Sequence, residues 1–170
     1  MSERKLEGPQ PATAITPFQA PSEYNAAWDK LVPLAATELL IFDRDLRDGG
    51  WSALARNAAL RDFLMGNRAS RLQIIVHEIT YIEGFLPRMV LLLRDFSYRI
   101  QILRTVADGR RAWDAFAIVD GRHILHRFHQ DVMRGELALH APVKARELRE
   151  RFDEILQFTE PGVNATQLGL

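Results

Sequence analysis

Apolar and polar positions follow two periods along the chain, and the shorter period marks the expected strands. Residues 37–43 and 71–77 are compact, mainly apolar runs of the length expected for strands that are buried on both faces. Residues 98–105 alternate between apolar and polar side chains, which predicts a third strand. Longer segments with a different period separate these strands, so we expect helices to connect them.

The longer period, with apolar residues three and four positions apart, predicts these helices. A first helix is expected from Ser22, which can act as its N-cap, until Pro33 stops the pattern. A second helix should be capped by Ser52 and end near Gly66, and a third should begin at about Phe85. The order strand, helix, strand then indicates a right-handed crossover.

Turn chemistry organises the second half of the chain. An Asp-Gly pair at residues 120–121 separates the apolar runs 112–119 and 122–128, an arrangement typical of a tight β-hairpin. A short strand is expected over residues 136–140, followed by a helix that begins at Pro142 and has one apolar face. Antiparallel strands beside an initially parallel set predict an α/β fold with a mixed β-sheet sandwiched by helices.

The two ends of the chain lack such patterns. Residues 1–21 hold prolines and few large apolar side chains, so we expect a disordered N-terminal arm. Residues 159–170 predict an irregular tail, in which Leu168 and Leu170 are candidates for docking on the core. The expected domain therefore spans residues 22–158. The charged N-terminus lacks the apolar core of an export signal, which predicts a cytoplasmic protein.

Composition narrows the range of functions. The 170 residues suit one domain, and 22 basic residues balance 22 acidic ones, so we do not expect a nucleic acid or an anionic membrane as a partner. Binding of nucleic acid through the Arg-rich residues 99–134 stays an alternative, and it predicts an affinity that falls steeply with salt. The chain has no cysteine for a disulfide, a metal ligand or a nucleophile. No apolar run approaches the ~20 residues of a membrane span.

A family resemblance is carried by residues 113–121, Trp-Asp-Ala-Phe-Ala-Ile-Val-Asp-Gly, in their setting of alternating strands and helices. This segment resembles the motif strand of the phospholipase D superfamily, which reads His, any residue, Lys, four residues, Asp. The resemblance covers one half of that fold, from about Glu38 to Phe158. The chain is also similar to an uncharacterised proteobacterial domain that is found with acetyltransferases. Since the family's enzymes combine two such halves, the resemblance implies a homodimer.

The reactive residues of the motif are replaced in this chain. Laid on the sequence, the family's nucleophilic histidine falls at Trp113, its lysine at Ala115 and its aspartate at Asp120. The second motif of the family, Gly-Ser-x-Asn, is replaced by residues 127–130, Arg-Phe-His-Gln. An indole has no available lone pair with which to attack phosphorus, and alanine carries no charge to stabilise phosphoryl oxygens. We therefore expect a non-catalytic binding or interaction domain, with Trp113 packed in the dimer interface.

The family's reactive residues line a cleft, and the remaining residues of this chain suggest two alternatives for the corresponding region. Arginines that point into it could retain an anion site for a phosphate-containing ligand, for which Arg104, Asp120, Arg127 and His126 are the candidates. These arginines could instead pair with nearby aspartates on the surface. A phosphodiesterase or nuclease with a rebuilt site would use Asp120 and nearby arginines with the histidines His77, His123 or His126.

Other candidate clusters give weaker signals. The spacing of His123, His126 and His129 does not suit a metal site on a strand, and we expect neither a metal nor a cofactor. A carboxylate cluster formed by Asp43, Asp45 and Asp48 with Glu38 is interpreted as a charged loop at a strand end. The pair at residues 77–78, His-Glu, could face the same cleft as Asp43.

Overall fold

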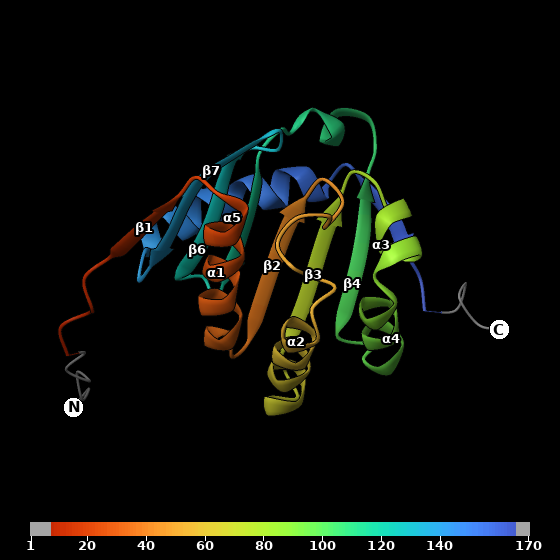
Figure 1. Ribbon diagram of the computed structural model, residues 1–170, viewed down its shortest axis with the longest axis horizontal. Helices are drawn as coiled ribbons and strands as arrows, with labels where there is room; N and C mark the ends of the chain where they lie inside the picture. The colour runs from red at the N-terminus through yellow and green to blue at the C-terminus, as the bar shows by residue number, and fades with distance from the viewer. Residues whose placement is uncertain (1–7, 166–170) are drawn as a thin grey trace, which may run out of the picture.

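An eight-stranded mixed sheet runs through the middle of the molecule, with the strand order β1-β7-β6-β5-β2-β3-β4-β8 (Figure 1). The computed structural model describes residues 8–165. Strands β2, β3 and β4 are parallel to one another, and every other neighbouring pair is antiparallel. The strands are β1 (Ala14–Phe18), β2 (Glu38–Asp43), β3 (Arg71–Val76), β4 (Ile100–Thr105), β5 (Ala115–Val119), β6 (His123–His129), β7 (Val132–Leu139) and β8 (Thr159–Val163).

Helices cover both faces of this sheet, as the sequence predicts. Figure 1 shows α1, α2, α3 and α4 in front of the sheet and α5 behind it. The α-helices are α1 (Pro21–Leu31), α2 (Leu54–Gly66), α3 (Thr80–Phe85), α4 (Pro87–Asp95) and α5 (Pro142–Leu156), with short 3-10 helices at Val32–Leu34 and Ala107–Arg111. No helix within residues 8–165 is long and apolar enough to cross a membrane.

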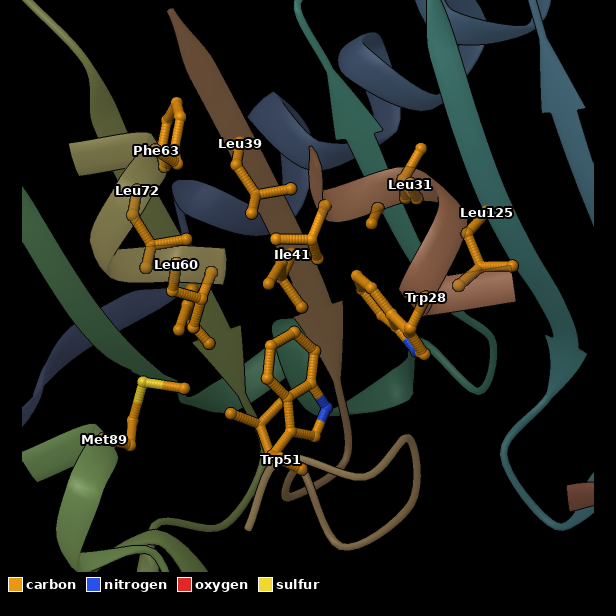
Figure 2. Packing of buried hydrophobic residues seen from close by; sticks show 14 of the residues in the cluster. Trp28, Leu31, Leu39, Ile41, Trp51, Leu60, Phe63, Leu72, Met89 and Leu125 are labelled. Atoms are coloured by element: carbon orange, nitrogen blue, oxygen red, sulfur yellow. The ribbon is translucent and has the colours of Figure 1, made fainter. Parts of the chain in front are cut away.

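Two apolar layers hold the sheet between these helices, because alternate residues of a strand point to opposite faces. On the α1–α4 side, Ile41 of β2 packs among side chains that include Trp28 of α1, Leu60 of α2 and Met89 of α4 (Figure 2). On the α5 side, Phe42 belongs to a second cluster with residues of β5 and α5. Strand β2 is therefore buried on both faces of the sheet.

The predicted hairpin is confirmed and has a tight turn. Strands β5 and β6 pair in antiparallel register from Val119 and His123 to Ala115 and Arg127. Asp120 and Gly121 both have positive φ, at 51° and 65°. Two consecutive positive φ values match the right-handed twist of the flanking strands, and Asp-Gly is a pair that adopts them.

Several elements differ from the sequence predictions. Helix α1 begins at Pro21 with Ala20 at its N-cap, so Ser22 does not cap it, and the helix expected from about Phe85 begins at Pro87. The strand expected over residues 136–140 is longer and begins at Val132.

Residues 14–18 lie within the expected N-terminal arm but form the edge strand β1, whose Phe18 is 2% exposed and packs on the Tyr24 ring at 5.0 Å between centroids. Helix α2 begins at Leu54 with Ala53 at its N-cap, so Ser52 does not cap it. Helix α3 was not predicted, because its six residues are too short to show a period.

The C-terminal tail contains one more strand. Residues 159–163 form β8 on the edge of β4, with an irregular register between Ile102 and Leu103. Both edge strands contain a proline, Pro17 in β1 and Pro161 in β8, which suits positions where one side of the strand needs no ladder hydrogen bond. The expected docking of Leu168 and Leu170, and residues 1–7 of the expected arm, lie outside the described residues.

Candidate functional site

A polar pocket of about 270 Å³ lies at the carboxyl end of β2. Strand β2 pairs with the parallel strand β3 on one side and with the antiparallel strand β5 on the other, so the topology of the sheet changes direction at this strand. Crevices outside the carboxyl ends of strands at such points are where open α/β sheets bind ligands. The pocket is lined by Asp43, Arg44, Asp45, Arg47, Asp48, Arg127 and Gln130.

The loop after β2 forms one wall of this pocket and is held in an unusual backbone conformation. Leu46 has a φ of 62°, and Gly49 and Gly50 have φ values of 102° and 75°. A Cβ at Gly49 would lie 2.9 Å from the indole nitrogens of both Trp28 and Trp51, so only glycine fits there. The turn at residues 48–50, Asp-Gly-Gly, thus closes the loop over Trp28 and Trp51.

Arg127 is a buried cation that fixes this loop to the β6–β7 hairpin. Its side chain is 7% exposed, and its guanidinium lies over the Tyr24 ring at 5.6 Å from the centroid. One Nη donates to Asp48 at 2.7 Å, the other donates to the Gln130 carbonyl at 2.6 Å, and Nε donates to the Val132 carbonyl at 3.0 Å. Every nitrogen of this guanidinium therefore has an acceptor from the protein itself.

The two arginines of the loop are also paired. Arg44 forms an ion pair with Asp131 and donates from Nε to the Gln130 side chain at 3.4 Å. Arg47 lies 3.5 Å from Asp45 and stacks over the Tyr81 ring at 5.1 Å. The arginines of the pocket are thus directed toward carboxylates and carbonyls of the same chain.

Asp43 is the exception among the charged groups of the pocket. It is 7% exposed, and none of the ion pairs formed within residues 8–165 includes it. Its Oδ2 accepts from the Leu46 N–H at 2.7 Å and more weakly from the Asp45 N–H at 3.4 Å. Burial raises the pKa of Asp43 to about 6, despite the Leu46 hydrogen bond and the nearby Arg127 charge, which lower it.

The residues at the positions of the family motif lie at two different ends of β5. Trp113 is 56% exposed at the pocket end, and Ala115 is buried at 1%. Asp120 lies five residues further on, which in a strand is about 16 Å away. Its carboxylate accepts from the backbone N–H groups of residues 36–38 at 2.8–2.9 Å. Although burial acts to raise it, these hydrogen bonds lower the pKa of Asp120, so this residue has a structural role at the start of β2.

The four residues suggested for an anion site are not brought together. Asp120 is at the opposite end of β5 from Arg127, which pairs across from Ala115. Arg104 lies on β4, two strands from β2, and forms an ion pair with Glu160. His126 and Arg127 are neighbours on one strand and therefore point to opposite faces. The single cleft expected from the sequence is therefore not formed by this set.

The histidines are also separated from the pocket, whose lining contains none. His77 is buried, and its Nε2 donates to the Ala112 carbonyl at 2.7 Å while its Nδ1 accepts from the Thr105 hydroxyl at 2.6 Å. Burial lowers the pKa of His77, which keeps the ring neutral. His123 Nδ1 accepts from the backbone N–H of His140 at 3.0 Å. Within residues 8–165, no group of three or more His, Asp or Glu side chains could hold a metal ion.

His126 belongs to a network on the α5 side of the sheet. Its Nε2 donates to one oxygen of Asp114 at 3.0 Å, and Arg151 of α5 donates to the other oxygen at 2.6 and 3.2 Å. Although burial acts to raise it, the hydrogen bonds from His126 and Arg151 lower the pKa of Asp114. This carboxylate occupies the position that an external anion would take between His126 and Arg151.

Three exposed apolar side chains lie at the ends of β5, β6 and β7 nearest the pocket, and we refer to these three residues as the rim. Trp113 is 56% exposed, Phe128 is 48% exposed and Val132 is 53% exposed. The His129 ring is parallel to the Trp113 indole, with centroids 6.2 Å apart. The Trp113 carbonyl accepts from the Gln130 N–H at 2.7 Å, which ties this rim to the pocket wall.

Asp43 was not singled out from the sequence as a site residue of this region. Asp43 was assigned to a charged loop, although it ends the central strand rather than entering the loop. Arg44 was not singled out, because its partner Asp131 lies 87 residues away in the sequence. The position of Asp43 at the end of a continuous apolar strand was the available signal.

Comparisons with known proteins agree with this architecture. The model of a family described as "Domain of unknown function (DUF7931)" matches residues 20–168. No curated protein matches the chain. Among solved structures, Nuc from Salmonella typhimurium, a phospholipase D family member, is similar with a TM-score of 0.59, 13% identity and coverage of 89% of this chain and 99% of that chain. NucT from Helicobacter pylori is similar with a TM-score of 0.61, 11% identity and coverage of 89% and 100%.

The fold also forms part of longer chains. Phosphatidylserine synthase from Haemophilus influenzae Rd KW20 is similar with a TM-score of 0.57 and 15% identity, over 93% of this chain and 42% of that chain. TrmBL2, an archaeal chromatin protein whose structure shows a novel mode of DNA binding, has a TM-score of 0.65 and 8% identity, over 88% and 55%. This chain therefore spans about half of these two proteins. At such low identity, the comparisons establish the phospholipase D-like α/β fold and nothing more specific.

Proposed function

This chain belongs to the DUF7931 family, and we propose that it is a non-catalytic phospholipase D-like domain that acts as a binding or interaction module. The observation that carries the proposal is the replacement of both reactive groups at the start of β5. Trp113 and Ala115 stand at the motif positions for histidine and lysine, and no histidine lines the adjacent pocket. The motif positions therefore supply neither a nucleophile nor a cation to stabilise the phosphoryl oxygens, and phosphodiester cleavage by the mechanism of this motif cannot occur.

Hydrolysis of bis(p-nitrophenyl) phosphate tests this proposal directly. The protein should release p-nitrophenol no faster than buffer, both with EDTA and with Mg²⁺, Mn²⁺ or Zn²⁺. Saturable hydrolysis by the unmodified protein would overturn the proposal. His126→Ala and Asp114→Asn are the matched variants, and neither should change the background rate.

A rebuilt phosphodiesterase or nuclease site is the second candidate, and the Asp114–His126–Arg151 network favours it. An aspartate that orients a histidine is a common arrangement for a general base. The three side chains lie on the α5 side of the sheet, and Asp114 accepts hydrogen bonds from both His126 and Arg151. Hydrolysis that is lost in His126→Ala would support this candidate. Hydrolysis that survives the substitution would exclude it as the source of the activity.

Retention of a phosphate site receives less support from the charges at the pocket. Arg127 and Arg44 are paired with Asp48 and Asp131, and the loop Arg47 lies beside Asp45. A phosphate would have to displace these carboxylates or add negative charge beside them. The interaction proposed for this domain is therefore one in which a phosphate-containing ligand is not required.

We further propose that the working form is a homodimer that buries the rim of Trp113, Phe128 and Val132. Exposed aromatic side chains are enriched at protein interfaces. The match to this chain covers 99% of Nuc and 100% of NucT, but only 42% of the synthase. The fold therefore occurs both as a single unit and as a part of longer chains. A cytoplasmic location and a bacterial source remain predictions of the sequence.

Light scattering after size-exclusion chromatography tests the homodimer. The unmodified protein should have twice the mass of one chain, and the double variant Trp113→Ala, Phe128→Ala should have the mass of one chain. Met65→Ala is the control, because Met65 is 68% exposed on α2, away from the rim. A monomeric unmodified protein, or a dimer that survives the double substitution, would contradict this interface.

A further inference from the structure

The pocket at the end of β2 is lined by equal numbers of arginines and aspartates, but one of its carboxylates forms no ion pair within residues 8–165. Its lining contains three arginines and three aspartates. Arg127 pairs with Asp48, Arg47 lies beside Asp45, and Arg44 pairs with Asp131 outside the lining. The carboxylate that has no cationic partner within the described residues is Asp43.

The hydrogen bonds of Asp43 leave one of its oxygens without a donor. Oδ2 accepts from two backbone N–H groups of its own loop, whereas no hydrogen bond within residues 8–165 reaches Oδ1. Asp43 is 7% exposed and lines the pocket, so a ligand in the pocket lies beside this carboxylate. A buried carboxylate is normally paired or bound to a cation, because removing it from water without a partner is unfavourable.

The arginines of the pocket do not supply this missing cation. The Arg127 nitrogens donate to Asp48 and to two carbonyls, and the Arg44 guanidinium is directed to Asp131 and Gln130. Arg47 lies over the Tyr81 ring and 3.5 Å from Asp45. None of these three arginines forms a hydrogen bond or an ion pair with Asp43, and the pocket that they line together with it has a volume of about 270 Å³. A pocket of this size has room for a small organic cation.

We infer that this pocket binds a guanidinium or ammonium group, with Asp43 Oδ1 as its acceptor and with Gln130 and Asp45 beside it in the pocket lining. This ligand class deepens the proposed interaction function, on which it rests, and it is opposite in charge to a phosphodiester. A planar guanidinium can donate to a carboxylate in fixed geometry, while an ammonium acts as a point charge. The cation is carried either by a free small molecule or by an arginine or lysine side chain of a protein partner.

The charged groups around Asp43 give the interaction a pH dependence. Tyr24 of α1, Arg44 and Asp45 of the loop and Arg127 of β6 are the charged or titratable neighbours that interact with its carboxylate. Since burial raises the pKa of Asp43 to about 6, its carboxylate is ionised at pH 7.5 and takes up a proton as the pH falls through 6. Affinity for the cation should decline over that same interval.

Titration with methylguanidinium, followed by backbone amide NMR shifts, tests the inference. The neutral isostere methylurea is the matched probe. We expect methylguanidinium to shift the amides of residues 43–48 at pH 7.5, with at least tenfold weaker binding by methylurea. Asp43→Asn should weaken methylguanidinium binding at least tenfold, while Asp108→Asn, which removes an exposed carboxylate outside the pocket, should not. Equal binding of both probes, or unchanged binding by Asp43→Asn, would overturn the inference.

Two further arms make the result interpretable. Titration with the peptide Gly-Arg-Gly distinguishes the two sources of the cation. If the peptide binds at least tenfold more tightly than methylguanidinium, the cation is an arginine or lysine side chain of a protein. If the two bind equally, the cation is a free small molecule. Both results support a cation site. Failure of all cationic probes would reject the ligand class, whereas the absence of phosphodiester hydrolysis would still stand. The two proposals therefore fail separately.

Discussion

Replacement of Asp43 by asparagine should stabilise the protein at neutral pH. Asparagine has the shape of the protonated aspartate, and its carbonyl oxygen can still accept the Leu46 N–H bond that the Asp43 carboxylate accepts at 2.7 Å. It removes a buried negative charge for which no ion pair exists within residues 8–165. The substitution therefore isolates the cost of that charge.

The magnitude follows from the pKa of Asp43, which burial raises from 3.8 to about 6. The folded state binds this proton more tightly than the unfolded chain does, so the ionised group lowers stability as the pH rises from 3.8 to 6. Each pKa unit corresponds to about 1.4 kcal/mol, and a difference of about two units gives about 3 kcal/mol above pH 6. Near pH 5 about half of this penalty should remain, and below pH 3.8 almost none.

Urea denaturation of Asp43→Asn and the unmodified protein at pH 7.5, 5 and 4 measures this difference. The free energy of unfolding of the variant should exceed that of the unmodified protein by about 3 kcal/mol at pH 7.5, and the excess should shrink toward pH 4. Asp108→Asn, at a carboxylate that is 62% exposed, is the control and should show little change. A variant that is less stable at pH 7.5, or an excess that is independent of pH, would refute the reasoning.

Other substitutions test the remaining parts of the site. Arg127→Met should lower the free energy of unfolding in urea by about 1–3 kcal/mol, because it leaves the Gln130 and Val132 carbonyls without their donor, whereas the exposed Arg122→Met should have little effect. Asp120→Ala should cost about 1–3 kcal/mol by the same assay, since three backbone N–H groups lose their acceptor. Because the pKa of Asp120 is lowered, its stabilisation is present above the unfolded pKa and lost as the pH falls through the folded value, so this difference should vanish in acid. Titration with millimolar inorganic phosphate, followed by amide NMR shifts, should leave the pocket residues 43–48 unshifted, and saturable shifts would restore the anion site.

The secondary structure was largely predictable because period and turn chemistry are local signals. The buried runs at residues 37–43 and 71–77 became β2 and β3, and the Asp-Gly turn closed the predicted hairpin. Residues 14–18 were missed because an edge strand with four of its five residues exposed has no apolar run to detect. Its strand state depends on pairing with β7, more than a hundred residues later in the chain.

The pocket was less predictable than the fold, because its properties depend on pairs that are far apart in the sequence. Arg127 and Asp48 are separated by 79 residues, and nothing local indicates that each neutralises the other. The same holds for Arg151, whose partner Asp114 is 37 residues away. Trp113, which the motif comparison singled out, lies at the same end of the sheet as the pocket. Asp43 could be identified as the unpaired carboxylate of the pocket only after the partners of Arg44, Arg47 and Arg127 were known.

The prolines at the two outer strands restrict how copies of this protein can assemble. Pro17 of β1 and Pro161 of β8 each lack the N–H that an added strand would need at that position. Growth of the sheet from one molecule to the next, which would produce open-ended fibres, is therefore disfavoured at both margins. Association should instead occur through side chains and stop at a closed, symmetric number of subunits.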